Sequence, residues 1–194
     1  MCNLYRMEQA PDVMRKLVAE LDRTLSFPEG IPNFQPRDVR ISERAPILRA
    51  AAGDAGGLEL VERRWSWPGP SGKPVFNYRG EGRRFPSGRC VILADGFYEF
   101  TAAADPARKT KQRWLFTMPG QDWFGIAGLV RDDAGVGEAF TMLTCPPGED
   151  VAPYHDRQVV VLSPPDCLRW LDPGVAADAL LHPAPAGTLR VDAA

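Results

Sequence analysis

Proline and glycine interrupt this chain so often that long helices have little room to form. The 194 residues include nineteen prolines and eighteen glycines. Proline lacks a backbone donor and glycine frees the backbone, so both tend to end regular elements. The spacing predicts many short strands joined by turns, with few helices.

Short apolar segments of strand length lie between these breaks. Residues 46–51 and 58–65 flank a glycine-rich stretch at 53–57, a pattern typical of a β-hairpin. Further strands are expected at 38–42, 89–94, 114–117, 124–130, 140–144 and 159–162. Helical spacing of apolar residues occurs at 11–22, and two shorter helices are predicted at 165–171 and 174–181. Strands with helices at their ends indicate an α+β domain.

The composition fits one soluble, cytoplasmic domain. Hydrophobic residues make up 44% and charged residues 25% of the chain, enough for one substantial core. No apolar run is long enough to cross a membrane, and charged residues occur too early for a signal peptide. We expect a monomer that does not associate with a membrane.

The cysteines and histidines form no zinc signature, so no metal or other cofactor is expected. Four cysteines are spread along the chain without a C-x-x-C pair, and the chain has two histidines. In a reducing compartment, Cys90, Cys145 and Cys167 are expected to be small buried hydrophobes.

Positive charge is concentrated in the middle of the chain. The net charge is −2, yet residues 63–113 carry eleven basic and four acidic residues. Such a segment fits either phosphate binding or an ordinary solvated face.

A cysteine follows the first methionine, and this pair has special chemistry if the methionine is removed. Cys2 would then carry a free α-amine beside its thiol. An α-amine has an ordinary pKa of about 8, so roughly a tenth is neutral at pH 7, far more than for lysine. Together, amine and thiol convert an aldehyde first to an imine and then to a five-membered thiazolidine.

Three further segments accompany this start: 77–81 (Asn-Tyr-Arg-Gly-Glu), 95–100 (Asp-Gly-Phe-Tyr-Glu-Phe) and 154–157 (Tyr-His-Asp-Arg). As a set, the four resemble the SOS response-associated peptidase (SRAP) family over essentially the whole chain. Members begin Met-Cys and carry Asn-x-Arg-x-Glu, Gly-Phe-Tyr-Glu-Trp and a late His-x-Arg. We therefore expect one SRAP-like domain over residues 1–194, an α+β fold on a mostly antiparallel, barrel-like sheet with a few peripheral helices.

The resemblance implies covalent capture of abasic sites in single-stranded DNA through Cys2, with possible reversal and lyase-type strand cleavage. Glu99 is the candidate acid for opening the abasic sugar. His155 is the candidate proton carrier, because imidazole titrates near neutrality. Asn77 is expected to orient the sugar or the Cys2 backbone. These residues with Cys2 form the predicted catalytic set, and His182 is expected to be structural or exposed.

DNA contacts are expected from the basic segment. Arg79 is the candidate phosphate contact beside the lesion, and Arg83, Arg84 and Arg89 extend the positive track. Trp65 and Trp67 offer possible stacking surfaces, with core packing expected for at least one of them.

Two neighbouring charges are expected to hold site residues in place. Glu81 is predicted to position Arg79, and Arg157 either supports His155 or pairs with Asp156. The family often has Met-Cys-Gly-Arg-Phe at its start, whereas this chain has Asn3-Leu4-Tyr5. Arg6 is the candidate replacement for the missing arginine.

Two other functions compete with the abasic-site hypothesis. The first is a cysteine peptidase using Cys2 and His155, perhaps only to remove Met1, which matches the family's nominal hydrolase classification. The second is a single-strand binding module without covalent chemistry, based on the basic segment alone.

Overall fold

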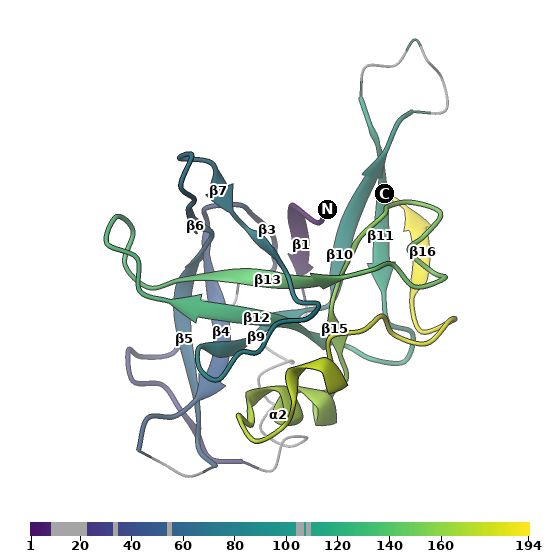
Figure 1. Cartoon of the computed structure of the whole chain (residues 1–194). Helices are drawn as coiled ribbons and strands as arrows, with labels where there is room; N and C mark the ends of the chain where they lie inside the picture. Colours follow the sequence, from purple (N-terminus) through teal and green to yellow (C-terminus); the bar gives the residue numbers. More distant parts are fainter. Residues whose placement is uncertain (9–22, 33–34, 54–55, 104–106, 108–109) are drawn as a thin grey trace.

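Strands dominate the computed structural model, which describes residues 1–8, 23–32, 35–53, 56–103, 107 and 110–194 (Figure 1). A five-stranded sheet has the order β16-β11-β10-β1-β3. The bounds in that order are Arg190–Ala193, Gln112–Thr117, Gly96–Thr101, Leu4–Met7 and Arg37–Arg40.

A larger sheet has the order β14-β13-β12-β9-β4-β5-β2, with β15 paired to β12 and β8 paired to β13. Their bounds are β14 Gln158–Val159, β13 Ala139–Cys145, β12 Phe124–Arg131, β9 Arg89–Ala94, β4 Arg44–Ala50, β5 Leu58–Trp65, β2 Leu25–Ser26, β15 Val161–Leu162 and β8 Asn77–Arg79. A two-stranded sheet joins β6 (Trp67–Pro68) to β7 (Pro74–Val75).

The prediction of a mostly β chain with short strands is confirmed. The 46–51 and 58–65 segments form the antiparallel hairpin β4–β5, and the segment 89–94 is β9. The barrel-like shape of the sheet stays a prediction. The strand pairings of the larger sheet include one closed circuit, in which β13 pairs with β12, β12 with β9, β9 with β4, β4 with β5, and β5 again with β13.

The helix predictions were less accurate. Helix α2 (Pro164–Leu171) confirms the segment 165–171, and Ser163 caps it by accepting from the Asp166 backbone N–H. The predicted helix at 174–181 was wrong, because only a 3-10 turn, η1 (Ala177–Ala179), forms there. The segment 11–22 lies outside the described residues.

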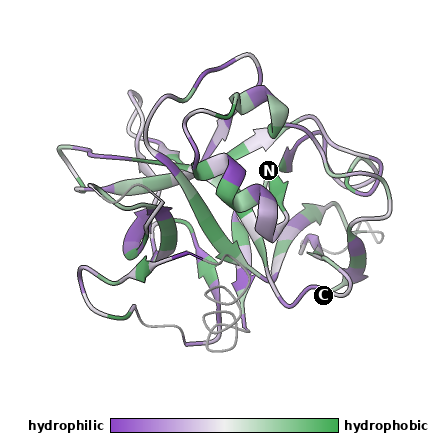
Figure 2. Ribbon diagram, turned by 90° about the horizontal axis from the view of Figure 1, so that it is seen from below, coloured by the Kyte–Doolittle hydropathy of each residue, from purple (hydrophilic) through white to green (hydrophobic). Residues whose placement is uncertain are grey.

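Strand β9, in the middle of the larger sheet, is buried on both of its faces, which explains its continuous apolar run. Alternate residues of β9 point to two clusters: Cys90 and Ile92 join one that includes Cys2 and Tyr5. Val91 lies in the other, with α2. In Figure 2 this helix shows both hydrophilic and hydrophobic residues, as expected for a helix with one buried side.

Helix α2 comes unusually close to β12. A side chain at Gly125 would place its Cβ 2.4 Å from the Cys167 sulfur, so glycine is required for this approach. Cys90, Cys145 and Cys167 are all free and fully buried, as predicted.

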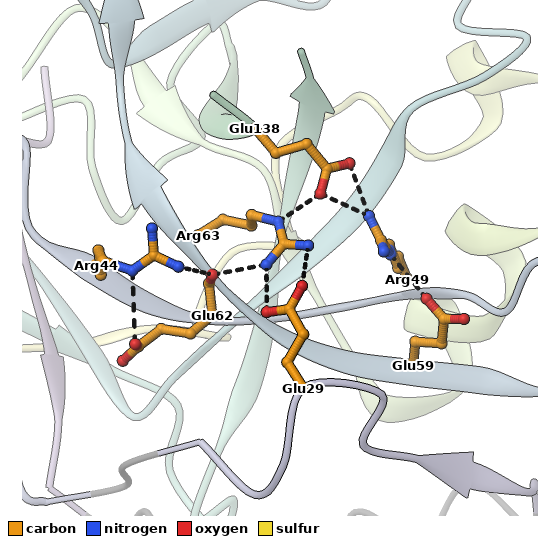
Figure 3. A network of polar contacts seen from close by, with 7 residues as sticks. All are labelled: Glu29, Arg44, Arg49, Glu59, Glu62, Arg63 and Glu138. Carbon is orange, nitrogen blue, oxygen red and sulfur yellow. Dashed lines mark hydrogen bonds and ion pairs between the residues drawn. The ribbon is translucent and has the colours of Figure 1, made fainter. Parts of the chain in front are cut away.

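An ion-pair network ties the hairpin β4–β5 to other parts of the chain (Figure 3). Arg63, whose side chain is only 8% exposed, binds both oxygens of Glu29 and also contacts Glu138. Arg49 bridges Glu138 and Glu59. The shared carboxylate of Glu138 therefore joins two arginines.

Within the described residues, no helix combines the length and apolar character needed to cross a membrane.

Candidate active site

The start of the chain lies against the five-stranded sheet, where β1 pairs with β10 and β3, and Met1 is 45% exposed. The Met1 α-amine contacts His155 Nε2 and lies 3.3 Å from Glu99 Oε2. Cys2 is 1% exposed. Pairing of β1 therefore brings the first two residues against the predicted catalytic groups.

Glu99 comes from β10, where it is 1% exposed. Burial raises its pKa to about 7, opposed by the nearby α-amine and by a backbone hydrogen bond from Cys2. Among the described residues its Oε1 has no hydrogen-bond partner. Glu99 thus presents a buried oxygen and exchanges protons near neutrality.

His155 lies in the turn that precedes β14. The Arg157 backbone N–H points at its Nδ1 from 3.0 Å, and Asp156 Oδ1 lies 2.8 Å from the same nitrogen. Its Nε2 faces the α-amine. Burial, and then the positive amine, lower its pKa, which favours the neutral imidazole.

Asn77 reaches the site from β8. Its side-chain N–H donates to the Cys2 carbonyl oxygen at 2.7 Å. The other side-chain atom, Oδ1, is buried and has no partner among the described residues. Asn77 therefore holds the Cys2 backbone and leaves one acceptor unused.

The Cys2 thiol has different neighbours from the amine. Its Sγ contacts the Leu4 carbonyl oxygen at 3.3 Å. Burial, and then the charge of Glu99, raise the pKa of this thiol well above its usual range. The sulfur is consequently a neutral thiol at physiological pH.

One of the two predicted supporting contacts was wrong. Glu81 binds the Arg157 guanidinium through both oxygens rather than positioning Arg79. Arg157 also donates to the Thr144 carbonyl and hydroxyl oxygens. This anchor fixes the backbone beside His155, so the prediction that Arg157 supports His155 is confirmed.

Arg6 does not take the place of the missing family arginine. Its guanidinium binds Asp95 at 2.5 Å, and Asp95 also accepts from the Glu8 backbone. Leu4, at the family's arginine position, is buried. The chain therefore lacks that positive group beside Cys2.

The predicted DNA-binding residues fall into two groups. Arg79, Arg83 and Arg84 are exposed. Arg83 lies over the Tyr78 ring and donates to its hydroxyl. A groove of about 540 Å³ runs beside them, lined by Trp67, Tyr78, Arg83, Arg84, Phe85 and Arg131 among others.

The second group is structural. Trp65 is fully buried and its indole N–H donates to the Phe76 carbonyl, so it offers no face to a base and its predicted stacking role was wrong. Arg89 is 9% exposed and donates to backbone carbonyls around the end of α2. With Arg63 bound in the ion-pair network, the basic segment is not one continuous surface.

Sequence reasoning missed two members of the site. Asp156 was considered only as a partner of Arg157, yet its carboxylate lies against the His155 ring. Arg131 was overlooked, although it stacks on Trp67 in the groove. The adjacency of Asp156 to a candidate proton carrier was the signal for the first; nothing local marked the second.

Comparison with known proteins places this arrangement in a family. The model of the SOS response associated peptidase (SRAP) family matches residues 71–193. "Abasic site processing protein YoaM" of Bacillus subtilis is 27% identical over 192 residues, which cover 89% of this chain and 80% of the relative. "Abasic site processing protein YobE" of the same species is 33% identical over 138 residues, covering 62% of each chain.

Similarity extends to a further curated relative and to solved structures. "Abasic site processing protein YedK" of Escherichia coli is 25% identical, covering 88% of this chain and 79% of the relative. A crystal structure from Bordetella bronchiseptica superposes with a TM-score of 0.73 at 23% identity, covering 100% of this chain and 99% of the other. One from Bacteroides thetaiotaomicron gives 0.72 at 17% identity, covering 99% of this chain and 91% of the other. The chain belongs to the SOS response-associated peptidase family.

Proposed function

We propose that this protein captures abasic sites in single-stranded DNA as a covalent thiazolidine formed by Cys2 after Met1 has been removed. The names of the relatives support an abasic-site substrate. The observation that carries the proposal is the contact of the chain's α-amine with both Glu99 and His155. An amine between two proton-exchanging groups is suited to imine formation.

Removal of Met1 transfers the free amine to the Cys2 nitrogen. Glu99 already contacts both positions, since the Met1 amine lies near Oε2 and the Cys2 backbone donates to the same carboxylate. The new amine therefore stays against Glu99. The space of Met1 then receives the opened sugar, with His155 beside it.

Imine formation moves two protons from the amine nitrogen to the aldehyde oxygen. The ammonium gives the first to a base, its nitrogen attacks the aldehyde carbon, and the second passes from nitrogen to oxygen as the carbinolamine forms. The hydroxyl then leaves as water with a returned proton, and the nitrogen lone pair completes the C=N bond. Glu99, with its pKa of about 7, is suited to both directions of transfer.

The thiol closes the ring in a second step. The Cys2 sulfur adds to the iminium carbon, the π electrons return to nitrogen, and the thiol proton is released. A raised pKa makes this thiol a poor nucleophile toward other targets. Attachment of the carbon to the neighbouring nitrogen compensates by holding the two atoms together.

We propose that the strand continues along the groove beside Arg83. Arg79 follows Asn77 on β8, and the groove residues Arg83, Arg84 and Arg131 offer guanidinium groups for phosphates. Trp67 is only 5% exposed under Arg131, and the Tyr78 ring lies under Arg83, so in this proposal the guanidinium groups and not the aromatic rings carry the contact with the strand.

The contacts of Cys2 weigh against the competing peptidase. A cysteine peptidase requires a thiolate activated by its base. Here His155 faces the amine, and the thiol contacts the Leu4 carbonyl. A purely non-covalent binding module gives no reason for burying Glu99 against the amine.

The test is incubation of the protein with a single-stranded oligonucleotide containing one abasic site, followed by denaturing gel and intact mass. We expect a heat-stable product whose mass is protein without Met1 plus DNA minus one water. Cys2→Ser should lose this product, because no sulfur ring closes. An oligonucleotide without the lesion is the control. A heat-stable adduct of Cys2→Ser, or reaction of protein that retains Met1, would refute the proposal.

A further inference from the structure

One nitrogen of the His155 ring, Nδ1, faces both a hydrogen-bond donor and a hydrogen-bond acceptor. The Arg157 backbone N–H points at Nδ1 from 3.0 Å, and the Asp156 carboxylate lies 2.8 Å from it. A neutral imidazole has one N–H, so Nδ1 either accepts from Arg157 or donates to Asp156. The two contacts require different tautomers.

The choice at Nδ1 decides what Nε2 can do at the reacting centre. When Nδ1 donates to Asp156, Nε2 has a lone pair and accepts a proton. When Nδ1 accepts from Arg157, Nε2 carries the hydrogen and donates it. Nε2 contacts the Met1 α-amine, one residue before the Cys2 nitrogen that reacts, so the tautomer sets whether His155 starts as base or donor beside that nitrogen.

The N-terminal ammonium can only donate hydrogen bonds, so its contact with Nε2 selects the tautomer that has the lone pair on Nε2 and the hydrogen on Nδ1, for which Asp156 is the acceptor. The Arg157 side chain is anchored by Glu81 and Thr144, which holds its backbone N–H in place. The Asp156 side chain is 89% exposed. Other charges that act on the ring are the α-amine and Lys111, and both oppose its protonation.

The geometry points to Asp156 as a positioning residue that keeps the proton of His155 on Nδ1, so that Nε2 accepts the proton of the attacking amine. This inference rests on the proposed function and adds a role within the same site. Glu99 takes the first proton of the Cys2 ammonium, and Nε2 takes the second proton, which the nitrogen releases after it has attacked the aldehyde carbon. The imidazolium is held by Asp156 through Nδ1–H, and both protons return to the aldehyde oxygen, which leaves as water. No net proton is gained or lost.

The tautomer can be measured without DNA. Long-range ¹H–¹⁵N correlation spectra at pH 8 report which ring nitrogen is protonated, and the chain has two histidines to assign. A His182→Gln variant identifies the His155 signals. We expect the Nδ1–H form in the natural protein and the Nε2–H form in Asp156→Ala. Glu149→Ala, an exposed carboxylate before the same turn, is the matched control. An unchanged tautomer in Asp156→Ala would overturn the inference.

The second readout is the rate of single-turnover crosslinking, measured between pH 5 and 9. Asp156→Ala should slow the plateau rate about fivefold, the factor expected for an exposed polar pair. Its acid limb should move to lower pH, because the carboxylate no longer favours the imidazolium. Asp156→Asn should be intermediate, and Glu149→Ala unchanged. Identical pH–rate profiles for Asp156→Ala and the natural protein would refute this inference and leave the proposed function standing. Absence of any crosslink in the natural protein would refute the proposed function.

Discussion

At the scale of single residues, Glu99 has the environment of a proton donor and acceptor. It is almost completely buried, and its pKa of about 7 leaves it half protonated near neutrality. A surface glutamate would be fully ionised there. Its position on a paired strand also holds it rigidly against the start of the chain.

Glu99→Gln should lower crosslinking at least about 100-fold, because removal of an acid–base group has effects of this order. Stability should respond in the opposite direction. The folded pKa is raised from 4.5 to about 7, so folded protein binds more protons and loses stability as pH rises through that window. At pH 8 the variant should gain up to roughly 3 kcal/mol.

Thermal unfolding of both proteins at several pH values measures this effect. The gap between Glu99→Gln and the natural protein should widen between pH 4.5 and 7 and stay constant above. Glu149→Gln serves as an exposed control. A gap independent of pH would mean that the Glu99 carboxyl is not perturbed.

Asn77 acts on the backbone rather than on a proton. Asn77→Ala removes the donor to the Cys2 carbonyl and should slow single-turnover crosslinking about tenfold, corresponding to one hydrogen bond of roughly 1.5 kcal/mol. Asn77→Asp places a carboxylate oxygen against that carbonyl and should be slower at pH 8 than the alanine variant. Equal rates for all three proteins would exclude this positioning role.

At the scale of elements, the sequence predicted best those segments whose faces are both buried. The run 90–94 is apolar throughout because it packs on two sides, and the predicted segment 89–94 matched the bounds of β9. Strands such as β1 and β8 were missed, since three or four residues carry little periodic signal and form by pairing with distant strands. The segment 174–181 was assigned as a helix although Pro173 and Pro183 leave little room for one.

The end of helix α2 depends on an arginine that the sequence suggested for DNA. Arg89 stacks on Trp170 and donates to the carbonyls of Phe85, Asp172 and Val175. The Asp172 and Val175 carbonyls directly follow the helix, so the guanidinium joins the end of α2 to the segment before β9 that contains Phe85.

Arg89→Ala should therefore cost roughly 3 kcal/mol of stability, because several buried carbonyls lose their donor. Urea unfolding measures this cost. Arg83→Ala is the matched comparison: it should leave stability nearly unchanged and reduce the salt slope of single-strand binding by about one. A salt slope reduced equally by both variants would place Arg89 at the DNA after all.

At the scale of the whole molecule, four separate elements bring the catalytic candidates together. Cys2 precedes β1, Asn77 is on β8, Glu99 is on β10 and His155 lies before β14. The sequence motifs predicted these residues, and the contacts of Met1 and Cys2 join them. A motif does not tell which face a side chain takes, which is why buried Trp65 was misassigned.

The ion-pair network of Figure 3 holds the molecule together away from these contacts. Arg63→Ala should cost roughly 3 kcal/mol, because it leaves Glu138 without one of its two cations and opens a buried space. Urea unfolding should show this loss, while the rate of crosslinking at a temperature where both proteins are folded should be unchanged. A slower rate would couple the network to the site.

The burial of the Cys2 thiol protects it from oxidation and alkylation. Oxidants and alkylating agents attack thiolates that solvent can reach, and this sulfur is neither ionised nor exposed. In the proposed reaction, the sulfur reacts only after an aldehyde carbon has been attached to the nitrogen of the same residue.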